Sequence, residues 1–242
     1  MISFIKPFNK FEWMIAIRYL RSKRSDGGIS AMTWISLIGI SLAVFALIAT
    51  LAVRSGFRTE FVNTILGANA HASIYNSPYI NNDGVIVSGF SNYDITTNEI
   101  SKIKGVLSVS PVVKGQVMAN ANGQNQGVEV FGSKLSDIKK LPLIATPELS
   151  KGSIENFDKG IAIGSGVARS LGLEIGDVIT LISPDGVKTA FGTSPRISGF
   201  EIVYIFQVGR YDIDNTRIYM PLKNAQIYFN REGRVDEFEV MV

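Results

Sequence analysis

The stretch AMTWISLIGISLAVFALIATLAV (residues 31–53) contains no charged side chain, and eleven of its 23 residues are Leu, Ile, Val or Phe. As a helix it would extend about 35 Å, enough to cross a hydrocarbon layer about 30 Å thick. Moving the eleven apolar side chains into lipid favours insertion by about 3–7 kcal/mol before the polar residues are counted. A core helix of a soluble protein normally keeps one polar face, so this stretch predicts a membrane-spanning helix.

Basic residues are concentrated on the N-terminal side of this stretch. Six Lys or Arg residues lie between positions 6 and 24, opposed only by Glu12 and Asp26. Because short basic segments stay on the cytoplasmic side, we expect a cytoplasmic N-terminus and a location across the membrane for everything after about residue 54. A cleaved signal peptide would have an apolar core of only about 7–15 residues, so we expect an anchor that is retained.

The net charge of +3 is unevenly divided along the chain. Residues 1–60 carry a net charge of +5, whereas residues 61–242 carry −2. A nucleic-acid-binding protein would need a basic face on its globular part, so we expect no nucleic acid as a partner. The basic N-terminal segment is better suited to anionic lipid headgroups.

The residues before the apolar stretch predict a short separate helix. Residues 11–20 (FEWMIAIRYL) place aromatic and basic side chains such as Trp13 and Arg18 at helical spacing, as in helices that lie in the membrane interface. They could instead be the first turns of a longer membrane helix, but Asp26-Gly27-Gly28 interrupts the pattern. We expect residues 1–28 to form a cytoplasmic N-terminus with an interfacial helix.

The residues after the apolar stretch continue a helical pattern. Phe57, Phe61 and Ile65 recur at every fourth position as far as Gly67, a residue that commonly ends helices. We therefore expect residues 29–67 to form the membrane helix together with a stalk of about three turns.

The remaining residues, 68–242, predict one folded domain that is large enough to bury a core and contains no cysteine. Short β-rich runs alternate with short helical runs, and strands dominate, so the predicted fold class is α+β. Asn122-Gly123 lies between two β-rich runs and is a strong signal for a hairpin turn.

We find no set of residues that predicts catalysis, a metal site or a cofactor site. The chain has one histidine, His71, which we expect to be a partly exposed strand residue, and no cysteine. Gly164-Ser165-Gly166 lacks the third glycine of a dinucleotide fingerprint, because Arg169 occupies that position. Asp212 and Asp214 are expected to be solvated rather than metal-binding. We therefore expect a non-catalytic protein without a cofactor.

One connection is longer than a hairpin requires. Residues 184–198 (PDGVKTAFGTSPRIS) join two predicted strands, 177–182 and 200–208, although hairpin connections usually take two to five residues. A long protrusion with an aromatic residue, Phe191, and two cations suits partner binding. The alternative is a loop without fixed structure. The candidate binding residues are Lys188, Thr189, Ala190, Phe191, Gly192, Thr193, Ser194, Pro195 and Arg196.

Four stretches together resemble one family, the LolC/LolE permease subunits of the lipoprotein-releasing ABC transporter. The third stretch is shared with the wider MacB-like group, whereas the fourth, with its long hairpin insert, distinguishes the LolC type from MacB and FtsX relatives. The stretches are FEWMIAIRYLRSK (11–23), WISLIGISLAVFALIATLAVRSGF with FVNTILG (34–57 and 61–67), GIAIGSGVARSLGLEIGDVITLISP (160–184), and FGTSPRISGFEIVYIFQVGRYDID with YMPLKNAQIYF (191–214 and 219–229).

The resemblance implies a bacterial inner-membrane protein with an elbow helix, a first membrane helix and a MacB-like periplasmic domain. It implies a second LolC/LolE-type permease subunit and a LolD-type ATPase that supplies all ATP hydrolysis. It also implies triacylated lipoproteins as cargo, and a carrier, LolA, captured by a hook-like β-hairpin that would fall at about residues 184–199. The first membrane helix lines a lipid cavity in this family, so Val44, Phe45 and Ile48 become candidates for contact with acyl chains.

The chain departs from this family in its length, and two other functions compete with the family's. Members of the family have three further membrane helices after the periplasmic domain, so we expect the 242-residue chain to be truncated before them. The protein could also be a MacB-like or FtsX-like mechanotransmitting permease that binds no carrier. An anchored envelope enzyme is a third, weaker hypothesis.

Overall fold

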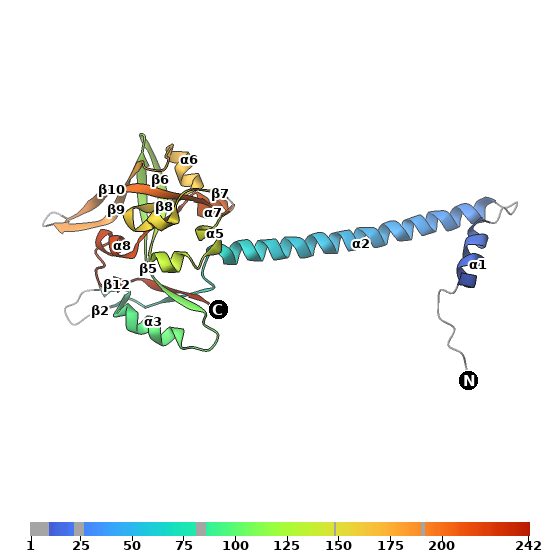
Figure 1. Cartoon of the computed structure of the whole chain (residues 1–242), viewed down its shortest axis with the longest axis horizontal. Helices are drawn as coiled ribbons and strands as arrows, with labels where there is room; N and C mark the ends of the chain where they lie inside the picture. The colour runs from blue at the N-terminus through green and yellow to red at the C-terminus, as the bar shows by residue number, and fades with distance from the viewer. Residues whose placement is uncertain (1–9, 22–26, 81–85, 148, 190–191) are drawn as a thin grey trace. The chain divides into compact units, whose positions relative to one another are not determined.

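The structure is a computed structural model that describes residues 10–21, 27–80, 86–147, 149–189 and 192–242. The chain divides into two compact units, Met1–Phe61 and Val62–Val242. The first unit contains helix α1 (Lys10–Arg21) and most of helix α2 (Gly27–Ala68), and the second contains an α+β domain (Figure 1). The predicted fold class is therefore confirmed.

Helix α2 is continuous over 42 residues and joins the predicted membrane helix to the predicted stalk. Its candidate membrane span covers Ala31–Val62, and the most apolar window of this span has no side chain buried against the rest of the protein. The hydroxyl of Thr50 donates a hydrogen bond to the carbonyl of Ala46 at 2.7 Å. A polar group in this segment is thus satisfied within the helix, as a lipid environment requires.

Six strands of the second unit form a closed ring in the order β5, β6, β11, β8, β10, β9 and back to β5. The pairs β6–β11 and β8–β10 are parallel, and the other pairs are antiparallel. Closing the ring satisfies the backbone edges that an open sheet would expose. The strands are β5 (Ser108–Ala121), β6 (Gln124–Ser133), β8 (Ile161–Gly164), β9 (Val178–Thr189), β10 (Gly192–Gln207) and β11 (Arg217–Pro221).

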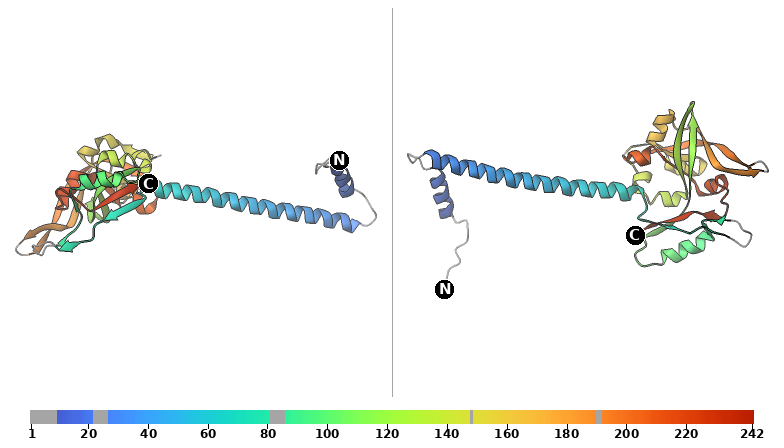
Figure 2. Two further views of the ribbon diagram at one scale, coloured as in Figure 1. Left: turned by 90° about the horizontal axis from the view of Figure 1, so that it is seen from below. Right: turned by 180° about the vertical axis from the view of Figure 1, so that it is seen from behind.

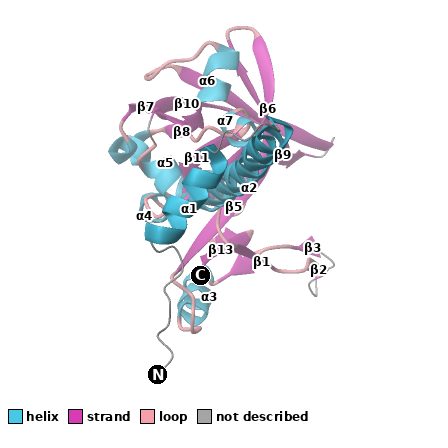
Figure 3. Ribbon diagram, turned by 90° about the vertical axis from the view of Figure 1, so that its right-hand side faces the viewer, coloured by secondary structure: helices cyan, strands magenta, loops and turns pink. Residues whose placement is uncertain are grey.

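Three strands extend this ring at its sides (Figure 3). Strand β13 (Glu237–Met241) pairs with the first half of β5, β1 (Ala72–Tyr75) pairs with β13, and β7 (Leu149–Gly152) pairs with β10. Two small sheets complete the strands: β2 (Tyr79–Ile80) with β3 (Ile86–Val87), and β4 (Phe90–Ser91) with β12 (Arg234–Val235).

The helices of the domain are short, as the sequence predicted. The longest, α3 (Tyr93–Ser101), packs against β5, and α8 (Leu222–Tyr228) packs against β6. The close approach of α8 depends on Gly132, because a Cβ atom there would collide with Ala225. The others are α4 (Leu135–Ile138), α5 (Pro142–Ala145), the 3-10 helix η1 (Ile154–Lys159), α6 (Ser165–Leu171) and α7 (Tyr211–Asp214).

The two faces of the strands bury two different hydrophobic clusters. Alternate residues such as Val130 and Ile163 belong to a first cluster that includes side chains of α6 and α8. Their neighbours Phe131 and Ala162 belong to a second cluster, which α4, α5 and η1 help to form. Strands that are buried on both faces lose the simple alternation of polar and apolar residues, which explains the continuous apolar runs in the sequence.

The predicted hairpin turn at Asn122-Gly123 is confirmed. Both residues have positive φ angles, 51° and 75°, as a two-residue turn between β5 and β6 requires. The side-chain amide of Asn122 also donates hydrogen bonds to the carbonyls of Leu171 and Gly172, both at 2.9 Å. The tip of this hairpin is therefore held against the C-terminal end of α6.

Candidate partner-binding hairpin and its supports

Strands β9 and β10 continue well beyond the ring and form a hairpin that projects from it (Figure 2). The sequence predicted strands ending at 182 and beginning at 200, joined by a protrusion. In the structure both strands run through that protrusion, and the pairing extends outward to Thr189 and Gly192. The protrusion is thus an extended β-hairpin, as the family resemblance implied, rather than an irregular loop.

The structure places most of the candidate binding residues on these two strands. Lys188 pairs with Thr193, and Thr189 pairs with Gly192, at the outer end of the hairpin. Ala190 and Phe191 lie outside the described residues. Pro195 is exposed near the base of the hairpin.

The base of the hairpin contains an irregularity in the pairing. Ser194 pairs with Val187, whereas Arg196 pairs with Ser183, so three residues of β9 face a single residue of β10. Such bulges bend a strand and redirect the part beyond them. A Cβ atom on Gly186 would collide with the Ser194 carbonyl, so only glycine lets the two backbones approach this closely.

Arg196 contacts its own domain, which the sequence did not predict. Its guanidinium donates to the backbone carbonyl of Ile227, at the end of α8, and to Oδ1 of Asn230 at 2.7 Å. The side-chain nitrogen of Asn230 donates to the carbonyl of Gly186 at 3.2 Å. Arg196 therefore holds the base of the hairpin against the end of α8.

An aromatic group lies beneath this base. The Tyr228 ring packs edge to face against Phe200 of β10, with ring centroids 5.6 Å apart, and against Phe229 at 4.9 Å. The Tyr228 hydroxyl is buried and has no hydrogen-bond partner among the described residues. Burial raises the pKa of Tyr228 to about 12, although the Arg196 charge acts in the opposite direction.

An open, largely apolar groove runs beside the base of the hairpin. Met118 of β5, Ile182 and Pro184 of β9, and Pro195 of β10 supply most of its apolar lining, and Glu129 of β6 supplies a charge. The groove shares Ile182, Pro184 and Pro195 with the two strands of the hairpin.

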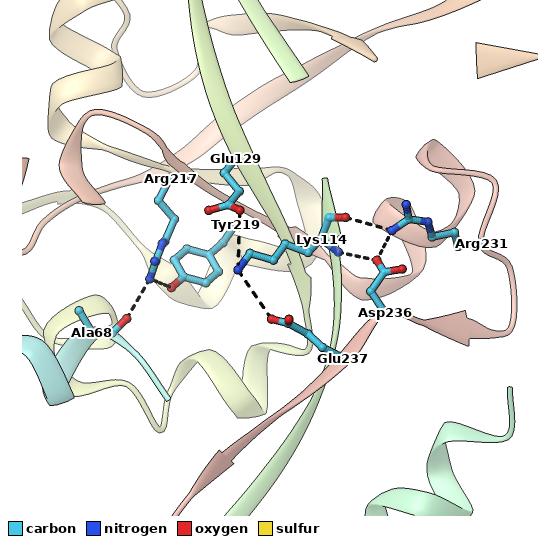
Figure 4. A network of polar contacts seen from close by, with 8 residues as sticks. All are labelled: Ala68, Lys114, Glu129, Arg217, Tyr219, Arg231, Asp236 and Glu237. Carbon is cyan, nitrogen blue, oxygen red and sulfur yellow. Dashed lines mark hydrogen bonds and ion pairs between the residues drawn. The ribbon is translucent and has the colours of Figure 1, made fainter. Parts of the chain in front are cut away.

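A second cluster of polar residues lies where α2 ends (Figure 4). The Arg217 guanidinium donates to the carbonyl of Ala68, the last residue of α2, at 2.9 Å, and to the Tyr219 hydroxyl at 3.3 Å. A cation at this position favours a helix C-terminus, and the last turn of α2 has no basic residue of its own. This junction cluster comprises Ala68, Lys114, Glu129, Arg217, Tyr219, Arg231, Asp236 and Glu237.

The Phe131 ring joins the two halves of the junction cluster. Lys114 Nζ lies 4.6 Å and Arg217 Cζ 4.4 Å from its centroid. Lys114 Nζ also lies 3.7 Å from a Glu129 oxygen and 3.8 Å from a Glu237 oxygen. Burial raises the pKa of the Glu237 carboxyl, an effect that the nearby Lys114 charge opposes.

Arg231 and Asp236 form the other side of the junction cluster. They make an ion pair, and both contact the backbone of Lys114: Asp236 Oδ2 accepts from its N–H at 2.8 Å, and Arg231 donates to its carbonyl at 3.0 Å. The sequence contained no signal for this cluster, because its members come from segments far apart in the chain. Through Arg217, the cluster holds the last residue of α2 against strand β11.

The lipid-contact candidates lie in the middle of α2. Val44, Phe45 and Ile48 are all exposed, and Val44 and Ile48 are one turn apart. Most of their neighbours on the helix are also exposed, so exposure does not separate the three from the other apolar residues of the span.

The two aspartates considered for metal binding lie in different environments. Asp214, expected to be solvated, is buried and accepts hydrogen bonds from the N–H groups of Val208 and Gly209 at 2.8 and 3.0 Å. Asp212 is exposed. Desolvation tends to raise the pKa of its carboxyl, but the hydrogen bond and charge of Arg210, together with backbone N–H groups, outweigh this effect and hold the pKa below its usual value. Within the described part of the chain, no three His, Asp or Glu side chains are arranged to hold a metal ion.

A family model described as MacB-like periplasmic core domain matches residues 33–242. Among curated proteins, the lipoprotein-releasing system transmembrane protein LolC of Neisseria meningitidis is 31% identical over 93% of this chain and 52% of its own length. LolE of Haemophilus influenzae is 28% identical over 89% of this chain and 51% of its own length. The chain thus spans about half the length of the curated relatives it matches.

Solved structures also resemble this chain. The periplasmic region of MacB from Actinobacillus actinomycetemcomitans has a TM-score of 0.44 and 10% identity, covering 70% of this chain and 72% of that structure. The extracellular domain of the transporter YknZ from Gram-positive bacteria has a TM-score of 0.42 and 15% identity, covering 71% of this chain and 83% of its own.

Proposed function

This chain belongs to the LolC/LolE permeases with a MacB-like periplasmic core domain, and we propose that it acts in releasing lipoproteins from the inner membrane and handing them to a periplasmic carrier. The observation that carries this proposal is the extended β9–β10 hairpin. In this proposal the two strands would serve as the carrier-binding hook that the resemblance to LolC-type subunits implies at about residues 184–199. A hairpin fixed at its base by Arg196 and Asn230 presents its tip in one direction, as capture of a partner needs.

The proposed partners follow from the same assignment. A LolD-type ATPase would hydrolyse ATP on the cytoplasmic side, a second LolC/LolE-type permease would complete the membrane part, and LolA would receive triacylated lipoproteins. The chain itself would be a non-catalytic membrane subunit. Its N-terminus would lie in the cytoplasm of a bacterium, and residues after about 54 would lie in the periplasm.

The proposed use of the hairpin can be tested by capture of purified LolA on the full chain in lipid nanodiscs. In the test variant a Gly-Ser segment of equal length replaces residues 188–194, which leaves Pro195 and Arg196 to hold the base. A matched control changes the other long hairpin of the domain, β5–β6, at its exposed Asn120–Asn125 pair to Ser. We expect the first variant to lose capture and the control to keep it.

The single substitution Phe191→Ala refines this test. Loss of one buried aromatic side chain costs about 1.5–3 kcal/mol, so the affinity for LolA should fall at least about tenfold. Capture that survives replacement of residues 188–194 would refute the hook assignment. It would favour the alternative, a MacB-like or FtsX-like permease that transmits force without a carrier.

The proposed lipid contact has its own test. A photo-crosslinking residue at Val44, Phe45 or Ile48 should label the acyl chains of a bound lipoprotein in the assembled transporter. Labelling of bulk phospholipid only, at all three positions, would contradict a role for these residues in the cavity.

A further inference from the structure

Asn230 occupies an unusual backbone position between α8 and the hairpin. Its φ angle is 55°, in the left-handed region that Asn tolerates better than most residues. The N–H of Arg231 donates to the carbonyl of Gln226 at 2.7 Å, and the N–H of Asn230 points back to the carbonyl of Ile227 at 3.3 Å. This pair of bonds is the Schellman arrangement that ends many helices. The fold of the α8 terminus therefore fixes where the Asn230 side chain begins.

From this position the Asn230 amide reaches both strands of the hairpin. Its Nδ2 donates to the Gly186 carbonyl of β9, and its Oδ1 accepts from the Arg196 guanidinium of β10. An asparagine amide has both a donor and an acceptor, so one side chain can hold two strands at once. The second Arg196 bond, to the carbonyl of Ile227, ties the same strand to the same helix end.

These contacts fall at the bulge, where the hairpin can change direction. Gly186 belongs to the three β9 residues that face one residue of β10, and Arg196 is the first β10 residue after the break in register. Beyond this point, the contacts that the structure describes for the hairpin are those between its own two strands. Its direction is consequently set by whatever holds the bulge.

We infer that Asn230 is a positioning residue for the hairpin: it sets the direction in which the tip projects and so tunes capture of a carrier. The part that concerns capture rests on the proposed function. Two neighbours extend the same support. Phe229 packs over Gly115, where a Cβ atom would collide with its ring, and Arg231 pairs with Asp236 in the junction cluster. The five residues 227–231 thus link the hairpin base to the centre of the sheet.

The test uses Asn230→Gly in the full chain. Glycine keeps the left-handed backbone and the end of α8 but removes both side-chain hydrogen bonds. The matched control is Asn92→Gly. Asn92 also has a left-handed backbone, with φ of 58°, and precedes α3 without a side-chain capping bond.

Two measurements separate a positioning role from general stabilisation. The chain has no cysteine, so spin labels can be attached at Lys188→Cys, on the outer hairpin, and at Lys223→Cys, an exposed position of α8. Double electron–electron resonance then reports the direction of the hairpin. We expect Asn230→Gly to broaden this distance distribution and to weaken LolA binding about fivefold, the effect of losing roughly one net hydrogen bond.

The outcomes distinguish this inference from the proposed function. An unchanged distance distribution in Asn230→Gly would overturn the positioning role. A broadened distribution with unchanged LolA binding, in a chain that needs residues 188–194 for capture, would overturn its part in capture. If residues 188–194 prove dispensable, the proposed function fails, and the distance distribution alone then decides whether Asn230 positions the hairpin.

Discussion

Replacing Arg217 by Met removes the contact between the domain and the last carbonyl of α2 while keeping a side chain of similar length. The hydrogen bond that is lost joins a charged donor, the Arg217 guanidinium, to the carbonyl of Ala68. Ala68 is fully buried, so water cannot readily replace the lost donor. Hydrogen bonds from charged groups contribute about 1.5–3 kcal/mol. The Arg217 guanidinium over the Phe131 ring contributes roughly a further 0.5–2 kcal/mol.

Because Met recovers part of the packing, the expected loss in the free energy of unfolding is about 2–4 kcal/mol. A domain of this size should then melt roughly 4–15 °C lower. Thermal unfolding of the full chain in detergent, followed by the far-ultraviolet signal of the strands, measures this change. Tryptophan fluorescence would miss it, since Trp13 and Trp34 both lie outside the α+β domain.

Two comparisons make the result interpretable. Arg210→Met removes an ion pair with the exposed Asp212 and should cost less than about 1 kcal/mol. Arg217→Lys keeps the charge without the planar fork and should fall between the parent and Arg217→Met. If Arg217→Met proves no more destabilising than Arg210→Met, Arg217 does not hold the end of α2, and the reasoning from the junction cluster fails.

Three further predictions concern other parts of the domain. Burial raises the pKa of Tyr228 to about 12 in the folded chain, whereas tyrosines of the unfolded chain ionise near pH 10. The folded state therefore loses stability between about pH 10 and 12, and this loss should be roughly 1–2.5 kcal/mol smaller in Tyr228→Phe. Urea unfolding at a series of pH values measures the difference. In Gly186→Ala the added Cβ atom would collide with the Ser194 carbonyl, so amide exchange in β9 and β10 should become faster. Gly127→Ala, whose Cβ atom would point into open space on β6, should leave exchange unchanged. Equal exchange in the two variants would contradict the close approach of the β9 and β10 backbones at Gly186. Asn122→Ala should lower the free energy of unfolding in urea by about 1–3 kcal/mol, because it removes two hydrogen bonds and places alanine in a left-handed backbone conformation. Asn122→Gly should lower it less, since glycine tolerates that conformation. A larger loss in Asn122→Gly than in Asn122→Ala would contradict this account.

Local signals in the sequence were sufficient for several elements. The uncharged stretch at 31–53 predicted a membrane helix because insertion depends on the summed transfer energy of consecutive residues. Asn122-Gly123 predicted a hairpin because both turn positions need positive φ angles, which these two residues tolerate. The long connection at 184–198 predicted a protrusion because its length exceeds what a compact hairpin needs.

The supports of the protrusion were beyond local reasoning. The sequence presented Arg196 as a cation available to a partner, and only the fold shows its guanidinium bound to Ile227 and Asn230. Asn is a residue that can end a helix, but that preference does not say what the Asn230 side chain holds. Asp214 was wrongly expected to be solvated, because its burial depends on the chain folding back over residues 208 and 209.

The sequence by itself determined the membrane helix, the α+β class, the two hairpins and the family resemblance, since each depends on neighbouring residues or on the order of motifs. The tertiary structure decided that the strands close into a ring, that Arg217 caps α2, and that the end of α8 holds the base of the hairpin. These features join residues separated by 31 to 149 positions. Such contacts form only when the strands of the whole domain have paired, so the local propensities of the residues do not predict them.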